Sequence, residues 1–289
     1  KNIYSIEQKL GLTFKEVIII VDNLNCSIIN ISGFKRLSGS QLTRENITYI
    51  LNSLKFIINE SEKKKEIIHI FNSKYILDKK KVTNLPIGLF GDFYSQELSC
   101  FLINKNYLKN LKSIFSQCNL KVNKIISKSF VEGANLINNK NLEHFVKIKL
   151  NKDDAQLIFF ENSSLKFFQD FNFGTNTIIS DISKVTGIEK KIVEKILDEN
   201  DLNNKANKDQ FIDRIYFKNK NFRKISKRLF IDIANARISE IAEIIFLKNI
   251  NMNFLEYKIP IFLNISDELQ RKNFLKNYEL NFSDKKKFN

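Results

Sequence analysis

The chain has 289 residues, and 43% of them are hydrophobic, which is enough to bury a core in each of two domains. The formal net charge is +15, a value typical of proteins that bind nucleic acids. The positive charge is spread along the whole chain, and Lys, Asn and Ile are abundant throughout. This composition is what an AT-rich genome produces at solvent-facing positions, so it favours codon bias over a functional basic surface. No aromatic-and-basic RNA-binding motif is present. A basic surface that attracts anionic lipid remains an alternative, notably at three lysine triplets: 63–65, 79–81 and 285–287.

Several classes of protein are disfavoured by local composition. The longest apolar run, Val17–Val21, is far shorter than the roughly 20 residues that cross a bilayer. No signal peptide is visible, and because the chain begins with Lys1 we expect its natural start to lie upstream. Three distant cysteines (Cys26, Cys100 and Cys118) predict a reducing cytoplasm and buried thiols, and with only two histidines no metal site is predicted.

The first half of the chain predicts a helix end, then a small α+β unit of about 85 residues with two strands before its helix and the others after it. Thr43 is expected to cap its helix, whose apolar residues recur at steps of three and four. These residues are Ile47, Ile50, Leu51, Leu54 and Ile58. The helix end is Lys1–Leu10, and the strands are Val17–Val21, Ser27–Ile31, Glu66–Phe71, Tyr75–Leu77 and Gln96–Ile103.

The second half predicts alternating helices and strands around a hairpin, Lys147–Phe168. Thr186 is expected to cap a helix, Asp198–Asp209 to form a mobile loop, and Ser283–Asn289 to be a frayed tail. The other expected helices are Tyr107–Cys118, Phe130–Ile137, Ile178–Val185 and Ile225–Lys248, and the other strands are Val122–Ser127 and Ile259–Leu263.

The glycine content excludes the common phosphate-binding motifs. The eight glycines include no adjacent pair and no Gly-x-Gly, so neither a Walker loop nor a dinucleotide fingerprint is present. No Gly-x-Ser-x-Gly nucleophile motif occurs, and Asp153-Asp154 is typical of a turn. The residues therefore predict a binding or scaffold protein with no catalytic residue, not an enzyme.

Three segments, read in order, resemble the bacterial cell-division protein family FtsA. "KYILDKKKVTNLPIGLFG" (74–91) is similar to its Tyr, Asp and Asn-Pro-x-Gly-x-x-Gly pattern. "SGFKRLSGSQLTRENITYILNSLK" (32–55) precedes it and "KNLKSIFSQCNLKVNKIISKSFVEGANLI" (109–137) follows it, as in the family. The resemblance extends over nearly the whole chain.

This resemblance implies an α/β, two-lobed fold of the actin/Hsp70 (ribonuclease H-like) class with an inserted small α+β domain of SHS2 type. It implies four segments. Residues 1–14 end the first actin-like subdomain segment, 15–103 form the inserted domain, 104–143 complete the first subdomain, and 144–289 form the second lobe with its outer partner-binding subdomain at 184–248. The family binds ATP, forms filaments and attaches to the membrane through a C-terminal amphipathic helix, which we expect downstream of this chain.

The family's nucleotide loops look degraded here. Its Asp-x-Gly-Gly-Gly-Thr-Thr-Asp loop corresponds to Lys149–Gln156, which has no glycine and begins with Lys149 in place of the magnesium-organising Asp. A later Gly-Gly corresponds to Gly174-Thr175, and the Gly-Gly of the adenosine pocket corresponds to Asn264–Ser266. Crowded backbone approaches phosphate poorly, so we expect weak or absent binding of ATP and magnesium, with Gly174 and Thr175 as the remnants of the site and the hairpin as scaffold.

The family's surface for the C-terminal peptide of FtsZ is better matched. Arg237, Glu240 and Lys227 correspond to its Arg-x-x-Glu-Ile helix and an upstream Ser-Arg, and Ile238, Ile241 and Ile244 are expected to provide an apolar face alongside. The alternative is an exposed ion pair worth a few tenths of a kcal/mol.

The resemblance implies a division scaffold without enzymatic activity, on the cytoplasmic face of the membrane at the division site. It would link FtsZ to that membrane, self-associate into filaments and recruit later division proteins through the inserted domain, without binding nucleic acid. A pilus-assembly relative of the same fold and a basic nucleic-acid-binding protein are the alternatives.

Overall fold

The computed structural model describes residues 2–22, 26–200, 202, 210–217, 223–252 and 259–284. Its contacts divide the chain into two compact units, Lys1–Phe145 with Ile158–Phe168 and Val146–Leu157 with Gln169–Asn289. The division passes through three strands, β7 (Phe145–Leu150), β8 (Ala155–Glu161) and β9 (Ser164–Phe171). No helix among the described residues has the length and apolar content needed to cross a bilayer.

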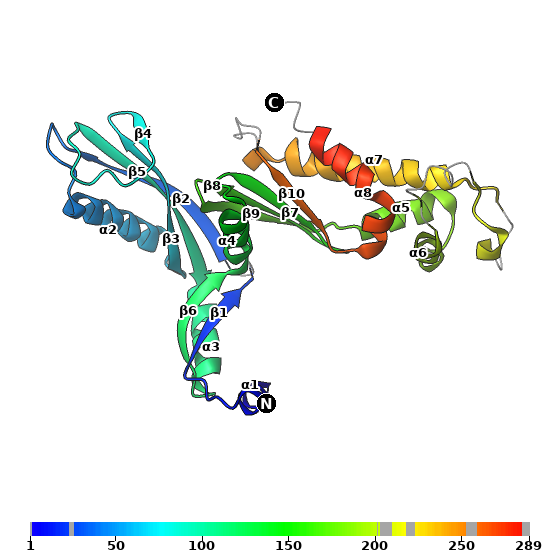
Figure 1. Ribbon diagram of the computed structural model, residues 1–289, viewed down its shortest axis with the longest axis horizontal. Helices are drawn as coiled ribbons and strands as arrows, with labels where there is room; N and C mark the ends of the chain where they lie inside the picture. The colour runs from blue at the N-terminus through cyan, green and yellow to red at the C-terminus, as the bar shows by residue number, and fades with distance from the viewer. Residues whose placement is uncertain are drawn as a thin grey trace. The chain divides into compact units, whose positions relative to one another are not determined.

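The first unit contains a four-stranded antiparallel sheet with a helix along one face (Figure 1). The helix starts as predicted at Thr43, which exchanges hydrogen bonds with Asn46 in a capping box. Four of the five predicted apolar residues are buried and Leu51 is partly buried. The sheet order is β2-β5-β3-β4, and the elements are β2 (Cys26–Arg36), α2 (Arg44–Ser61), β3 (Lys65–Leu77), β4 (Lys80–Val82) and β5 (Phe93–Asn104).

Two expectations for this region are wrong. The two strands predicted at 66–71 and 75–77 are one strand, β3, which a register shift between Asn72 and Lys74 interrupts. The predicted first strand, β1 (Glu16–Val21), pairs outside this sheet, so the order is β-α-β-β-β. Alternating apolar residues identify a strand, but its partner depends on distant parts of the chain.

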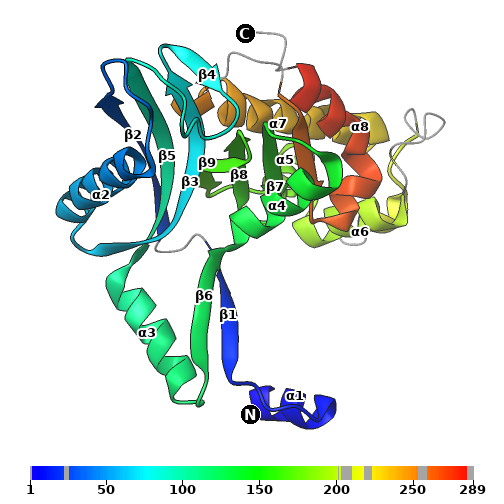
Figure 2. The ribbon, with the colours of Figure 1, turned by 60° about the vertical axis from the view of Figure 1, so that its left-hand side comes forward.

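Strand β1 lies parallel to β6 (Lys121–Ser127) in a two-stranded sheet. Figure 2 shows α3 (Lys105–Ser116) running alongside this pair, and Leu108 of α3 is buried in the same core as Val21 and Ile125. The remaining helices of this unit are α1 (Asn2–Leu10), which buries no residue, and α4 (Lys128–Lys140). The three cysteines differ, since Cys100 is buried, Cys26 is half-buried and Cys118 is exposed, so the expectation of three buried thiols is wrong.

The predicted hairpin is present in the sheet β10-β7-β8-β9, with β7 at Phe145–Leu150 and β10 at Ile261–Ile265. Asn162 and Ser163 form its second turn, and both have positive φ, as a type I′ turn requires. Strand β10 is parallel to β7, with Ile261 opposite Val146. Two successive turns reverse the chain twice, so β7, β9 and β10 all end at the same edge of the sheet.

The helices of the second unit are α5 (Asn176–Thr186), α6 (Lys190–Glu199), α7 (Lys227–Phe246) and α8 (Glu268–Asp284), and two 3-10 turns lie at Arg214–Phe217 and Ile250–Met252. α7 and α8 lie side by side (Figure 1). Thr186 does not cap α6, because it ends α5 and donates its hydroxyl to Ile182 O at 2.6 Å. The sequence did not predict α8, whose inward side mixes buried Phe274 and Tyr278 with buried polar residues. The predicted mobile loop and tail lie mostly outside the described residues.

Candidate functional site

The segments that correspond to nucleotide loops meet at one edge of the β10-β7-β8-β9 sheet. The turn after β7, the residues after β9 and the residue after β10 all lie there, and such an edge is where α/β folds commonly bind ligands. Lys149 and Asn264 lie one position further inside, opposite each other within β7 and β10. Sequence reasoning therefore identified segments that the structure brings together, although the ends of the aligned segments lie within strands.

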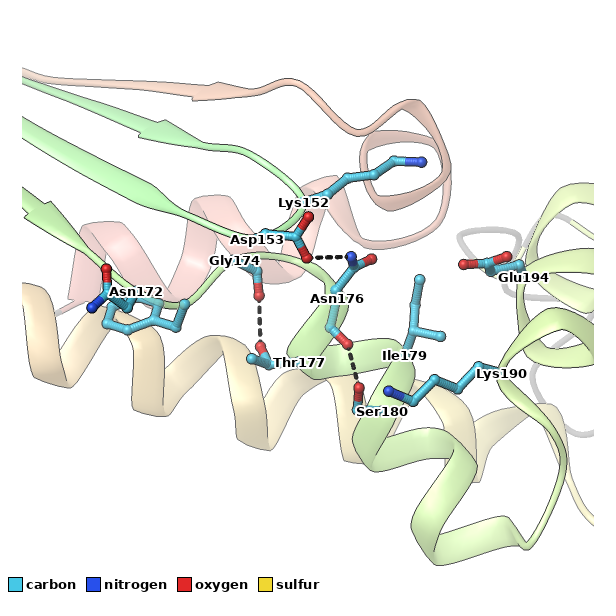
Figure 3. A pocket seen from close by; sticks show the side chains of 11 residues that line it. Lys152, Asp153, Asn172, Gly174, Asn176, Thr177, Ile179, Ser180, Lys190 and Glu194 are labelled. Carbon is cyan, nitrogen blue, oxygen red and sulfur yellow. Dashed lines mark hydrogen bonds between the residues drawn. The ribbon is translucent and has the colours of Figure 1, made fainter.

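The turn between β7 and β8 is closed on itself. Asn151 N donates to Asp154 O at 2.9 Å, and the Asn151 side-chain amide donates to Asp154 Oδ2 at 2.7 Å. Asp153 accepts from the Asn176 side-chain amide at 2.7 Å (Figure 3). The predicted turn role of Asp153-Asp154 is confirmed.

This turn also occupies the N-terminus of α5, where backbone N–H groups would otherwise be free to bind an anion. Thr175 N donates to Asn151 O and Asn176 N donates to Lys152 O, both at 2.9 Å. The turn is so close that a Cβ on Gly174 would lie 2.4 Å from Asn151 O and 2.5 Å from Lys152 O. The glycine is needed to admit protein backbone at this point, and the two donors are satisfied within the protein.

Thr175 is fully buried, and its hydroxyl donates to Asp267 Oδ2 at 3.0 Å. Asp267 is also buried and accepts a second bond, from Leu269 N at 3.1 Å. Sequence reasoning missed Asp267, although a carboxylate two residues after the end of a strand is a usable signal. Thr175 thus joins α5 to the start of α8.

A cavity of about 350 Å³ lies beside the start of α5 (Figure 3). Its charged side chains are two lysines, Lys152 and Lys190, and two carboxylates, Asp153 and Glu194, so it has no surplus positive charge for a triphosphate. Among the described residues, no group of three or more His, Cys, Asp or Glu could hold a metal. The residues present do not fit a magnesium triphosphate, because the loop donors are used internally and the charges cancel.

The predicted partner residues lie on α7, where they form part of a groove of about 340 Å³ between α7 and α5. Arg237 is paired with Asp181 on α5, and its Nη1 lies 2.7 Å from Glu240 Oε2. The hydrogen bond to Asp181 raises the pKa of Arg237, and the ion pairs with Asp181 and Glu240 hold the guanidinium in place. Val185, Ile233 and Ala236 provide the apolar part of the groove, and Val185 is 62% exposed.

Two expectations for this surface are wrong. Lys227 is buried and donates to Gln210 Oε1 at 3.0 Å, so it is not presented to a partner. Ile238 and Ile241 are buried against the core, and Ile244 is half-buried. A single helix face was inferred from spacing, but which side of α7 faces the core depends on α5 and α8. The apolar wall comes instead from Ile233 and Ala236 of α7 and from Val185 of α5.

No family model matches the chain. The curated cell division protein FtsA of Buchnera aphidicola subsp. Baizongia pistaciae (strain Bp) is 22% identical over 175 residues, which are 60% of this chain and 40% of that protein. The match therefore spans less than half of the relative's length.

Among solved structures, a chain of the PilM-PilN type IV pilus biogenesis complex matches 98% of this chain and 71% of its own length, with a TM-score of 0.51 and 7% identity. MreB 5 of Spiroplasma citri bound to AMPPNP matches 64% of this chain and 66% of its own, with a TM-score of 0.36 and 15% identity, too low to support an argument. The predicted actin-like α/β fold is confirmed, and the similarity to FtsA is confirmed in part of the chain.

Proposed function

We propose that this chain belongs to an FtsA-type cell-division scaffold that acts by recruiting partners, not by turning over nucleotide. The observation that carries the absence of turnover is the pair of hydrogen bonds from Thr175 N and Asn176 N to the carbonyls of the β7–β8 turn. Donors that are already paired inside the protein offer little to a phosphate. The similarity to an FtsA supports the division role.

Its partner in this proposal is the C-terminal peptide of FtsZ, bound in the groove between α5 and α7. An apolar wall beside the ion pairs of Arg237 with Asp181 and Glu240 suits a short peptide with apolar side chains and polar backbone groups. The proposal also includes an inserted domain, filament formation and attachment to the inner membrane face at the division site. These three parts rest on the resemblance alone.

Two measurements test the proposal. Calorimetry with the full-length protein is expected to detect no micromolar binding of Mg-ATP, and micromolar affinity would overturn the inactive-site part. Fluorescence anisotropy with a labelled FtsZ C-terminal peptide is expected to show about tenfold weaker binding for Arg237→Glu and for Val185→Ser. Val185 is exposed, so its replacement spares the fold. Arg228→Glu, at an exposed position on α7 outside the groove, is the matched control, and equal affinities for all variants would refute the peptide site.

A pilus-assembly actin-like protein is the second candidate, favoured by the match over 98% of the chain. In that case the FtsZ peptide is expected not to bind, whereas a protein of a type IV pilus biogenesis complex is expected to bind. A nucleic-acid-binding role predicts instead a steep decrease in DNA affinity with salt.

A further inference from the structure

One end of the β2-β5-β3-β4 sheet exposes an unusual concentration of large apolar side chains. Strands β2 and β3 end there and β5 begins there, so the loops at 37–42, 78–79 and 83–92 are neighbours. Phe34 and Phe90 are 67% and 68% exposed. We call this end of the sheet the apolar tip, defined by Phe34, Leu85, Ile87, Leu89, Phe90 and Phe93.

The exposure is built into the fold, because the backbone of the tip is held firmly. Gly88 N donates to Leu42 O at 2.8 Å, and Leu42 N donates to Leu89 O at 2.9 Å. Asp78 Oδ1 accepts from Phe93 N at 2.8 Å. Gly88 has φ +83°, a conformation that other residues rarely adopt. The loop therefore cannot easily turn its apolar side chains inward.

Positive charge surrounds the apolar tip. Six cations lie on the same three loops and the adjoining strand or helix ends, whereas the same segments contain three carboxylates, of which Asp78 already accepts backbone hydrogen bonds. In the part of the chain that the structure describes, none of the six cations forms an ion pair. They are Lys35, Arg36, Arg44, Lys79, Lys80 and Lys81.

We propose that the apolar tip docks on an anionic lipid bilayer. Protruding Phe and Leu side chains gain free energy by entering the boundary of the acyl chains, and the surrounding cations are attracted to anionic headgroups. The side chains of the apolar tip lie on turns and at strand ends. A bilayer can deform around such protruding side chains, whereas a protein partner would need a complementary groove. The proposal concerns the first unit alone and does not depend on nucleotide or FtsZ-peptide binding.

Vesicle flotation with the chain tests this proposal. Vesicles of phosphatidylcholine mixed with phosphatidylglycerol are expected to bind the chain, and vesicles of phosphatidylcholine alone to bind it far more weakly. Phe90→Ser is expected to weaken binding about tenfold, from the lost burial of one aromatic side chain. The double variant Lys79→Glu/Lys80→Glu is expected to weaken it by at least about 25-fold, because each lysine contributes about fivefold.

Matched controls distinguish binding through the apolar tip from nonspecific binding through any exposed apolar side chain or any positive charge. Phe56→Ser removes a phenylalanine that is also 68% exposed but lies on α2. Lys63→Glu/Lys64→Glu reverses two charges at the opposite end of the same sheet. Controls that bind like the wild type support the proposal. Controls that lose as much binding as the tip variants, or equal binding to both vesicle types, overturn it. Failure of the wild-type chain to bind either vesicle type also overturns the proposal, and indicates an acidic protein surface as the partner.

Discussion

Replacing Gly174 with alanine tests the close packing through which the β7–β8 turn occupies the backbone donors at the start of α5. The new Cβ would lie 2.4 to 2.6 Å from the backbone of Asn151 and Lys152, whereas ordinary contacts begin at 3.4 Å. The turn would have to move by about 1 Å, and backbone atoms cannot rotate away as a side chain can. The hydrogen bonds from Thr175 N and Asn176 N, now 2.9 Å long, would then exceed normal length.

The cost of Gly174→Ala follows from these contacts. Two backbone hydrogen bonds are each worth about 1 kcal/mol net, and overpacking adds about 1 kcal/mol or more, so we expect a loss of about 2–4 kcal/mol. Hydrogen exchange measures the loss of stability at individual amides. A local measurement is needed because a chain of two units need not unfold in one step. Protection of the Thr175 and Asn176 amides is expected to fall about thirtyfold or more.

Gly39→Ala is the control for this experiment. No atom lies within 4 Å of a Cβ there, but φ is +81°, so alanine is expected to cost only about 1 kcal/mol of conformational strain. The reasoning is refuted if the wild-type amides of Thr175 and Asn176 exchange as fast as exposed loop amides. It is also refuted if Gly174→Ala costs no more than Gly39→Ala, since the donors would then be free.

Two further predictions concern titratable groups of the first unit. Lys166 is buried with its Nζ 3.7 Å from Glu97 and 3.6 Å from Glu161, and burial lowers its pKa from 10.5. Between that lowered pKa and 10.5 the folded chain has lost the proton while the unfolded chain keeps it, so the free energy of unfolding rises with pH there. Lys166→Met is expected to flatten this rise in urea titrations, and unchanged slopes would contradict the assignment. For the cysteines, a thiol reagent at pH 8 is expected to modify the exposed Cys118 quickly and the buried Cys100 slowly, because burial raises the pKa of Cys100 to about 11. Mass spectrometry measures the two modification rates, and equal rates would contradict this prediction.

The local features of the fold were predictable because their causes are local. The Thr43 capping box and the apolar spacing of α2 lie within a few residues of each other, and the structure has both. The positive-φ turn at Asn162-Ser163 and the start of α7 next to Ser226 are of the same kind. Helix α8 escaped prediction because its buried Gln270 and Asn273 interrupt the apolar pattern.

The candidate site was predictable as a set of segments but not as an arrangement. The resemblance implied that Gly174-Thr175 and the β7–β8 turn belong to one site, yet the buried Asp267 partner of Thr175 comes from a distant segment. The resemblance assigned Lys227 to the partner surface, whereas the structure buries Lys227 and pairs it with Gln210.

The sequence by itself determined that this chain lacks glycine-rich phosphate loops, because residue identity alone decides where a Cβ is present. It also determined the types of most helices and strands through periodicity and caps. Tertiary structure decided which strand pairs with β1, that the β7–β8 turn occupies the donors of α5, and which side of α7 remains exposed. Each of these three features depends on contacts between groups that are far apart in the chain and come together only when the core forms. A local sequence pattern does not specify such contacts.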